Sequence, residues 1–335
     1  MSNTTREIRL AARPVGEPGP EHFTLATVDL PELTDGQVLV RNTWMSVDPY
    51  MRGRMDEGES YIPPFEVGAA LDGGAIGEVV ASKAEAVPVG ATVFHFLGWR
   101  QHAVLEASTV TVVDPALAPA QAYLGVLGTP GLTAYVSLTE IAPVRPGDVV
   151  FVSAAAGAVG SVAGQIAKQL GASRVIGSAG GPVKAKKLAD FGFDAALDYR
   201  SGPIGERLAA AAPEGIDVYV DHVGGDHLEA AIGAMRSGGR IALVGAISQY
   251  NATGPVPGPN LYPAAIKQLS LRGMVVSSYL DRFPEYLGRA AGWLADGVLR
   301  TEETVFDGLE RAPEAFLGVL SGVNTGKMLV RLDAR

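Results

Sequence analysis

The spacing of hydrophobic residues divides the chain into two parts. Between residues 7 and 113 the hydrophobic runs are short and strand-like, and Gly, Pro and Asp separate them. They are "FTLATVDL", "QVLVRNTWMSV", "AIGEVVAS", "ATVFHFL" and "QHAVLEASTVTVV". Short strands with this punctuation are typical of an all-β, barrel-like unit. We therefore predict a first domain over residues 1–120.

From about residue 121 strand-like and helix-like segments alternate. Strand-like "DVVFVSA", "RVIGS" and "DVYVDHV" are each followed by a helical pattern, namely "SVAGQIAKQLG", "GPVKAKKLADFG" and "DHLEAAIGAMRSG". Two further strands, "RIALVGAIS" and "LSLRGMVVS", come next. Such alternation predicts an α/β fold, a doubly wound parallel sheet covered by helices on both faces. We assign it to residues 121–304, with a helix near 282–299.

The remaining segments complete the expected organisation. The tail, residues 305–335, is expected to form a helix and then a strand that returns to the first domain. The proline-rich stretch "ATGPVPGPNLYP", residues 252–263, is longer than an ordinary connection, so we expect it to border a site.

Composition narrows the classes of function. A chain of 335 residues is long enough for two domains, and its net charge of −9 argues against a nucleic-acid partner. It has no cysteine, which excludes disulfides, thiolate nucleophiles and cysteine-ligated zinc. The uncharged run over residues 149–167 fits a strand, a glycine turn and a buried helix better than a membrane span. The first residues lack a signal-peptide pattern, so we expect a cytoplasmic protein without a membrane partner.

A glycine turn stands between the first strand and helix of the second part. Ala155, Gly157 and Gly160 occupy the positions of a dinucleotide fingerprint in "FVSAAAGAVGSVAGQIAK", with alanine in the place of the first glycine. Small residues let the backbone approach a pyrophosphate, and the following helix offers free N–H groups to it. Methyltransferases and ligand-free turns share this motif, but its place within successive strand–helix units favours a dinucleotide site.

The stretch after the next strand indicates which dinucleotide is bound. "GSAGGPVKAKK", residues 177–187, has no acidic residue to hold the ribose of NAD, but it contains Lys184. An acid there would repel a 2′-phosphate, whereas small residues and a lysine attract it. We therefore expect NADP(H) rather than NAD(H) as the cofactor. The alternative for Lys184 is a plain surface lysine.

Several separated stretches carry a resemblance to a known family. They are "MSVDPYMRGRM" (45–55), "SYIPP" (60–64), "LGTPGLTAY" (127–135), "AAAGAVGSVAGQIAK" (154–168), "GFDAALDYR" (192–200), "VGAISQYN" (244–251) and "NTGKMLVR" (324–331). Over nearly its whole length the chain resembles the zinc-independent medium-chain dehydrogenase/reductases, in the branch of prostaglandin, alkenal double-bond and curcumin reductases. The resemblance implies a GroES-like β-barrel catalytic domain, a Rossmann NADP-binding domain and a cleft between them.

The resemblance also implies roles for individual residues. In the glycine turn, the pyrophosphate contacts match Gly157, Ala158, Val159, Gly160 and Ser161. Lys184 and Tyr199 match the residues that hold the 2′-phosphate. Three further sets match the family's contacts to the nicotinamide half of the cofactor. They are the segment Gly245, Ala246, Ile247, Ser248 and Tyr250, a further strand with Met274, Val275 and Val276, and Asn324 from the tail. The family's usual "DNVGG" is "DHVGG" here, so His222 stands where an asparagine of the family meets the cofactor and is expected to be a cofactor-binding residue.

The chemistry follows from the lack of a metal site. Zinc-dependent relatives have a cysteine near Ser46 and a His–Glu pair near 68–71, and this chain has neither, so we expect no metal. Without a Lewis acid, alcohol oxidation is difficult, whereas hydride addition to the β-carbon of an enone needs only donors for the enolate oxygen. We expect Tyr250 and the nicotinamide ribose hydroxyl to be those donors and Tyr61 to be a second candidate. Tyr50 and Tyr61 match residues that line the substrate pocket, and Tyr50 is expected to contribute shape only.

The leading prediction is therefore an NADP-dependent oxidoreductase that reduces the C=C bond of α,β-unsaturated ketones or aldehydes. Quinone reduction and a non-catalytic NADPH-binding sensor or scaffold stay open as alternatives. Arg52 and Arg54 could clamp an anionic substrate, but we expect a structural role for them. By analogy with the family, "LSLRGMVVS" is expected to be an edge strand of a homodimer.

Overall fold

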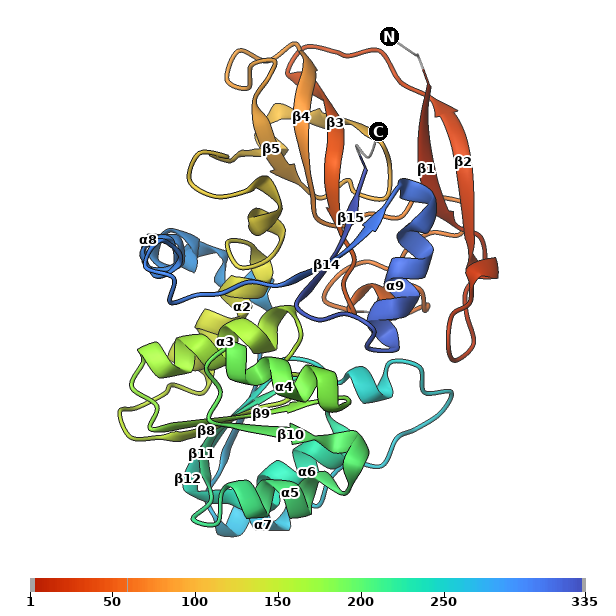
Figure 1. The fold of residues 1–335 in the computed structure, drawn as a ribbon. Coiled ribbons are helices and arrows are strands. Elements are labelled where there is room, and N and C mark those ends of the chain that lie inside the picture. Colours follow the sequence, from red (N-terminus) through yellow and green to blue (C-terminus); the bar gives the residue numbers. More distant parts are fainter. Residues whose placement is uncertain (1–3, 59, 333–335) are drawn as a thin grey trace. The chain divides into compact units, whose positions relative to one another are not determined.

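The computed structural model describes residues 4–58 and 60–332, which divide between two compact units. Of the described residues, the first unit comprises 4–58, 60–125, 303–324 and 328–332, and the second comprises 126–302 and 325–327. The expected fold class, a barrel-like domain with a Rossmann-type domain, is confirmed (Figure 1).

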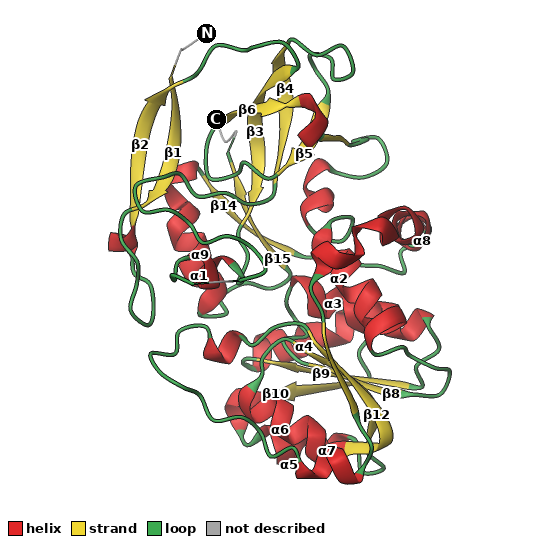
Figure 2. Cartoon of the chain, turned by 180° about the vertical axis from the view of Figure 1, so that it is seen from behind, coloured by secondary structure: helices red, strands yellow, loops and turns green. Residues whose placement is uncertain are grey.

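The first unit is built from two sheets. A hairpin of β1 and β2 forms the smaller sheet, and the larger, seven-stranded sheet has the order β14-β15-β3-β4-β5-β7, with β6 paired to β3 (Figure 2). The strands are β1 (Thr4–Leu10), β2 (Phe23–Asp29), β3 (Gln37–Ser46), β4 (Ala75–Ser82), β5 (Thr92–His95), β6 (His102–Glu106), β7 (Thr111–Val112), β14 (Glu303–Asp307) and β15 (Lys327–Arg331). The helices are α1 (Met51–Arg54) and α9 (Ala312–Leu320). The expected run "QHAVLEASTVTVV" is thus two strands, because a 3₁₀ turn over Ala107–Thr109 separates them.

A hydrophobic core joins the β1–β2 hairpin to α9. Phe23 stacks on Trp99 with ring centroids 6.1 Å apart, and the edge of Phe316 from α9 meets both rings. All three side chains are buried, which fixes the returning C-terminal segment in this unit. The tail also contains β14 ahead of its helix, a strand that the sequence pattern did not predict.

The second unit is a parallel six-stranded sheet with the order β10-β9-β8-β11-β12-β13. Figure 1 shows α3 and α4 on one face and α5, α6 and α7 on the other. Its strands are β8 (Val149–Val152), β9 (Arg174–Ala179), β10 (Ala195–Asp198), β11 (Ile216–Asp221), β12 (Met235–Leu243) and β13 (Ser270–Gly273). Its helices are α2 (Thr129–Val136), α3 (Ala158–Gln169), α4 (Pro182–Asp190), α5 (Ile204–Ala211), α6 (Gly225–Ala234), α7 (Tyr262–Ile266) and α8 (Phe283–Ala295).

The expected boundary between α6 and β12 is wrong. The helical pattern "DHLEAAIGAMRSG" predicts a helix to residue 238, but α6 ends at Ala234 and β12 begins at Met235. Met235 pairs with Ile216 of β11, and the register then shifts before Val218. Pairing with the neighbouring strand therefore overrides the local helical pattern, and Gly238 absorbs the irregularity with a φ of +76°.

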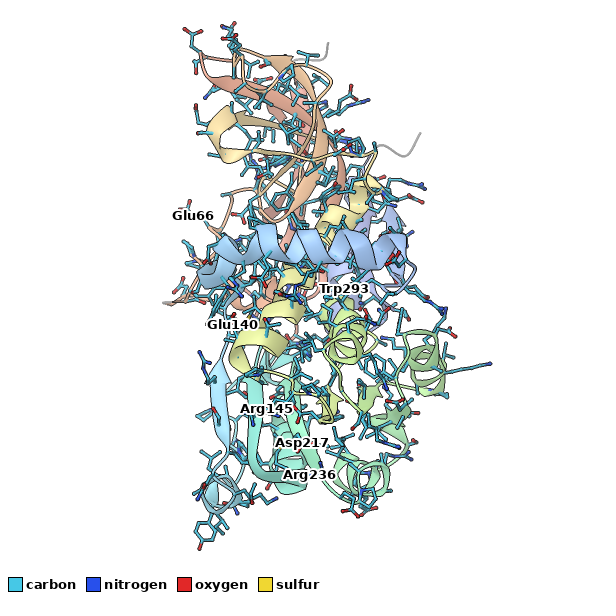
Figure 3. The ribbon with its side chains drawn as sticks, turned by 90° about the vertical axis from the view of Figure 1, so that its left-hand side faces the viewer. Glu66, Glu140, Arg145, Asp217, Arg236 and Trp293 are labelled. Carbon is cyan, nitrogen blue, oxygen red and sulfur yellow. The ribbon has the colours of Figure 1, made fainter. Side chains whose placement is uncertain are left out.

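Ion pairs fix the register of the central strands at their amino ends. Arg236, at the start of β12, binds Asp217 of β11 at 2.9 Å, and both are labelled in Figure 3. The same carboxylate accepts a hydrogen bond from Val149 N of β8 at 2.8 Å. A second, largely buried pair joins Arg240 to Asp148 at 2.6 Å. The opposite, carboxyl edge of the sheet carries the loops in which ligands bind in such folds.

Candidate functional site

The glycine turn leads from β8 into α3 at the carboxyl edge. Gly157 is the N-cap of α3, and no side chain caps the helix. The first turn contains the predicted residues Ala158, Val159 and Gly160. Their backbone N–H groups have no helix carbonyl one turn earlier that could accept a hydrogen bond. A Cβ on Gly160 would lie 2.5 Å from Ala154 O, so only glycine fits there. The turn therefore presents backbone donors and a helix dipole to an anion.

A segment from the far end of the sequence completes this turn. Gly326 N donates to Ala156 O at 2.7 Å, and Gly326 forms a bridge with Gly157. Gly326 has a φ of +67°, and a Cβ there would lie 1.7 Å from Glu302 O. Sequence reasoning missed this glycine, although it stands two residues after the predicted Asn324 in the motif "NTGK".

Two cations and a tyrosine gather at the loops after β9 and β10. A Cβ on Gly180 would lie 2.7 Å from Tyr199 Oη and 3.1 Å from Arg200 Nε, so both side chains lie over this glycine. Burial, and then the charge of Arg200, lower the pKa of Lys184. Lys184 is half-buried and Arg200 is exposed, and within the described ranges no carboxylate side chain pairs with the guanidinium of Arg200. This cluster of positive charge is suited to a phosphate group, and Arg200 is a member that sequence reasoning missed.

The carboxylate of Asp198 links the loop after β9 to the loop after β10. Its Oδ1 accepts hydrogen bonds from Gly181 N at 2.7 Å and from Arg200 N at 3.0 Å. The acid is therefore engaged with the backbone, and it fixes the spacing between the loop of Lys184 and the loop of Tyr199.

The carboxyl ends of β8 and β11 are joined through a buried carboxylate. Asp221 Oδ1 accepts hydrogen bonds from Tyr219 Oη at 2.7 Å, Val223 N at 3.0 Å and Gly224 N at 2.9 Å. Ser153 Oγ also donates to it over 3.4 Å. Asp221 is 1% exposed, so these donors replace water around its charge.

The predicted segment 245–248 lies along the residues that follow β11. Gly245 N donates to Asp221 O at 3.1 Å, Ile247 N to His222 O at 3.2 Å, and Ser248 Oγ to Val223 O at 2.5 Å. The structure thus brings His222 together with Gly245, Ala246, Ile247 and Ser248. His222 Nδ1 is 2.8 Å from Ser153 O, whereas its Nε2 is buried without a hydrogen-bond partner among the described residues.

Tyr250 ends this segment with its hydroxyl turned back toward the loop. Ala246 N donates to Tyr250 Oη over 3.4 Å, and burial raises the pKa of the phenol. Its oxygen therefore already accepts one hydrogen bond and keeps its proton at neutral pH. The hydroxyl proton can still be donated in a further hydrogen bond.

The expected strand through Met274, Val275 and Val276 is wrong. β13 ends at Gly273, and a 3₁₀ helix begins at Val276. Met274 N still donates to Leu243 O at 3.0 Å, which keeps this segment at the end of β12. The sheet pairing stops because Gly273 opposes Leu243, the last residue of β12.

The first unit holds the two remaining predicted residues. Tyr50 stands at the start of α1, and burial, followed by the charge of Asp48, raises the pKa of its phenol well above the ordinary value. Tyr61 interacts electrostatically with Tyr50 but is 62% exposed. Ser46, at the position expected to replace the zinc ligand, donates its hydroxyl proton to Asp48.

The two arginines of "YMRGRM" have the structural role that was expected. Arg52 binds Asp56 at 2.8 Å and Gly16 O at 2.9 Å. Arg54 binds Asp72 and Pro63 O, and its guanidinium lies 3.9 Å from the ring centroid of Phe65. Both guanidinium groups are buried among these partners, so they tie loops of the first unit together.

Metal ligands and membrane helices are not found in the described part of the chain. Residues 4–58 and 60–332 contain no cluster of three or more His, Asp or Glu side chains able to hold a metal ion. Over the same ranges, no helix has both the length and the apolar character that crossing a bilayer requires.

Comparison with known proteins agrees with the fold. Residues 6–113 match the family model described as the N-terminal domain of oxidoreductase, and residues 158–292 match the one described as zinc-binding dehydrogenase. The chain belongs to the medium-chain dehydrogenase/reductase family, in the branch that contains the curcumin and prostaglandin reductases.

Individual relatives span almost the whole chain. It is 44% identical to the putative NADP-dependent oxidoreductase YfmJ of Bacillus subtilis, over 99% of both chains. It is 37% identical to the NADPH-dependent curcumin reductase of Escherichia coli, over 96% of this chain and 95% of that one. Prostaglandin reductase 1 of Mus musculus is 40% identical, over 94% and 95%. The crystal structure of CurA in complex with NADPH from Vibrio vulnificus has a TM-score of 0.93 at 39% identity and covers 98% of this chain and 100% of that one.

Proposed function

We propose that the protein is an NADPH-dependent reductase of the C=C bond in α,β-unsaturated ketones or aldehydes. The observation that carries the proposal is Tyr250, whose hydroxyl accepts from Ala246 N and is thereby oriented to donate. Curcumin is itself a conjugated enone, and the relatives named for curcumin and prostaglandin reduction support this class of substrate. The NADPH complex of CurA supports the choice of cofactor.

The residues of the second unit fit NADP(H). Lys184, Tyr199 and Arg200 would hold the 2′-phosphate, and the first turn of α3, with the predicted Ser161, would hold the pyrophosphate. The segment 245–250, together with Met274, Val275 and Val276, would hold the nicotinamide half, and Asn324 would add a contact from the tail. When bound, NADPH would supply a hydride to the β-carbon of the enone. The C=C electron pair would then join the α-carbon to the carbonyl carbon, and the C=O electron pair would move to the oxygen of an enolate.

Tyr250 would stabilise the charge that develops on that oxygen. A hydroxyl that is held as a donor needs no reorientation when the enolate forms, and one such donor lowers the barrier by about 3 kcal/mol. Its raised pKa keeps the proton on the phenol, so Tyr250 donates a hydrogen bond without giving up the proton. The α-carbon would take its proton from water.

The first unit would supply the substrate pocket. The exposed hydroxyl of Tyr61 is a second candidate donor to the carbonyl oxygen. Tyr50 is partly buried and the pKa of its phenol is strongly raised, so its proposed role is to shape the pocket wall. For the assembly we propose a homodimer that pairs through β13, the edge strand of the six-stranded sheet. Size-exclusion chromatography with light scattering tests this, and a monomeric mass would refute it.

The function is tested by following NADPH consumption against a panel of enones, enals, quinones and saturated aldehydes, with identification of each product. The proposal expects saturated ketones or aldehydes from the enones and enals, with the carbonyl retained. Faster turnover of quinones would favour quinone reduction instead. Tight NADPH binding without turnover of any compound would favour a sensor or scaffold.

A further inference from the structure

The ring of His222 is held in one tautomer. Its Nδ1 lies 2.8 Å from Ser153 O, and its backbone N donates to Ser153 Oγ at 2.9 Å. A carbonyl oxygen only accepts, so Nδ1 must carry a proton. In the neutral ring Nε2 then carries a lone pair and acts as an acceptor.

This acceptor is buried without a protein partner. Nε2 has no hydrogen bond among the described residues, and the charged group beside the ring, Asp221, is engaged with Val223 N and Gly224 N. Burial lowers the pKa of His222 more than Ser153 O and Asp221 raise it, which keeps the ring neutral at pH 7. A buried acceptor without a donor destabilises the folded protein, and such an atom in a native protein calls for a ligand or a water.

The strand order indicates which part of a dinucleotide reaches this atom. The cation cluster of Lys184 and Arg200 follows β9 and β10, and the glycine turn follows β8. His222 follows β11, which lies beside β8 on the side away from β9. A cofactor with its 2′-phosphate at Lys184 and its pyrophosphate at α3 therefore extends its nicotinamide half toward His222.

The polarity of Nε2 selects among the groups on that half. Phosphate oxygens accept hydrogen bonds at neutral pH and cannot satisfy a second acceptor, so the donor must be a ribose hydroxyl or the carboxamide N–H of the nicotinamide. The ribose is the nearer of the two to the pyrophosphate, and His222 follows β11, the strand directly beside β8 and its glycine turn. We propose that His222 Nε2 accepts a hydrogen bond from a ribose hydroxyl on the nicotinamide half of NADP(H) and so positions the nicotinamide. This inference rests on the proposed use of NADP(H). It makes the cofactor the donor and the histidine the acceptor at the position where the family has an asparagine.

The direct test is nitrogen NMR of protein labelled with ¹⁵N-histidine. The spectrum of the free protein at pH 7.5 should show His222 with a protonated Nδ1 and a bare Nε2. NADPH should shift the Nε2 signal in the direction of an accepted hydrogen bond, whereas adenosine 2′,5′-bisphosphate, which lacks the nicotinamide ribose, should leave it unchanged. His222→Phe assigns the signal, and His222→Gln serves the same purpose if the first variant does not fold.

Binding measurements complete the test. Loss of one hydrogen bond should raise the NADPH dissociation constant of His222→Phe by about fivefold, with adenosine 2′,5′-bisphosphate bound as by the wild type. An Nε2 signal indifferent to NADPH, or equal shifts with both ligands, would overturn the inference. If neither ligand binds, it is the proposed cofactor that fails. If NADPH shifts the signal but no enone is reduced, the inference stands and the proposed reaction fails.

Discussion

The hydroxyl oxygen of Tyr250 accepts a hydrogen bond from the backbone N–H of Ala246, four residues earlier, over 3.4 Å. A Cβ on Gly245 would lie 3.1 Å from the same oxygen, so the loop leaves space there for the hydroxyl. The backbone of this short segment thus sets which way the phenol can donate. In the proposed reaction, Tyr250 would act as a preorganised donor to the substrate oxygen.

Tyr250→Phe removes this donor while it keeps the ring. We expect kcat for an enone to fall by about 10²-fold, the usual effect of deleting one oxyanion donor. The dissociation constant of NADPH should change by less than about twofold, since the variant keeps the ring and the backbone of the segment 245–250 and so changes the binding free energy by less than about 0.4 kcal/mol. Tyr262→Phe, at a residue that is 70% exposed, is the matched control. Steady-state kinetics and fluorescence titration check both values, and a fully active Tyr250→Phe enzyme would remove Tyr250 from the reaction.

Cofactor preference should depend on Lys184. The wild type should prefer NADPH to NADH by at least about tenfold, and Lys184→Ala should lose most of that preference, because a charge-assisted hydrogen bond to phosphate contributes about 1.5–3 kcal/mol. Arg200→Ala should reduce the preference further, since its charge faces the same site. Lys186→Ala, on an exposed face of α4, is the control and should leave it unchanged. The ratio of kcat/KM for the two cofactors is the measurement, and equal use of both by the wild type would contradict the electrostatic argument.

Local pattern predicted the architecture and the central motif of this molecule. The glycine turn and Lys184 stand in stretches whose spacing is set by strand–turn–helix geometry, whereas the segment 245–250 was implied only by the resemblance to the family. The errors arose where distant pairing decides the outcome, as at Met235, which joins a strand because Ile216 lies opposite it. Arg200 and Gly326 were missed because their roles depend on what the fold brings beside them. No local signal distinguishes an arginine next to Lys184 from one on the surface.

Acid should destabilise the protein through its buried histidines. Burial lowers the pKa of His95 to about 3 and also lowers the pKa values of His102, His222 and His227. Because the unfolded chain binds these protons near pH 6.5 and the folded one does not, stability is present above that pH and is lost as the pH falls below it. A histidine that stays neutral in the folded protein, as His95 does, contributes a slope that approaches about 1.4 kcal/mol per pH unit once the pH is below about 6.5.

Urea unfolding between pH 7.5 and 5.5 measures how the unfolding free energy changes with pH. This window lies above the pH range in which ordinary carboxyl groups titrate. In His95→Gln the glutamine can still donate to Asn42 Oδ1, as His95 Nε2 does. The unfolding free energy of this variant should depend less steeply on pH, because one proton fewer is taken up on unfolding. A wild-type unfolding free energy that does not change across this window would show that the histidines are protonated in the folded state.

Chelators should leave the activity intact. The described residues contain no cluster of potential ligands for a metal ion, and Ser46 is engaged with Asp48. Enone reduction after exhaustive dialysis against EDTA, and again with o-phenanthroline present, should match the untreated enzyme. An activity that falls with chelation and returns with zinc would mean that a metal takes part.

The glycine turn should not tolerate even one methyl group. In Gly160→Ala the new Cβ would meet backbone atoms, at 2.5 Å from Ala154 O and 2.8 Å from Ala155 Cα, so the turn must open. We expect the NADPH dissociation constant to rise by more than about tenfold, because the helix N–H groups no longer converge on the pyrophosphate. Gly288→Ala, in the middle of α8 with nothing within 4 Å of its Cβ, is the matched control and should instead stabilise the protein by about 0.5–1 kcal/mol. Thermal unfolding and NADPH titration of both variants separate the two effects, and normal NADPH binding by Gly160→Ala would show that the cofactor does not need this turn.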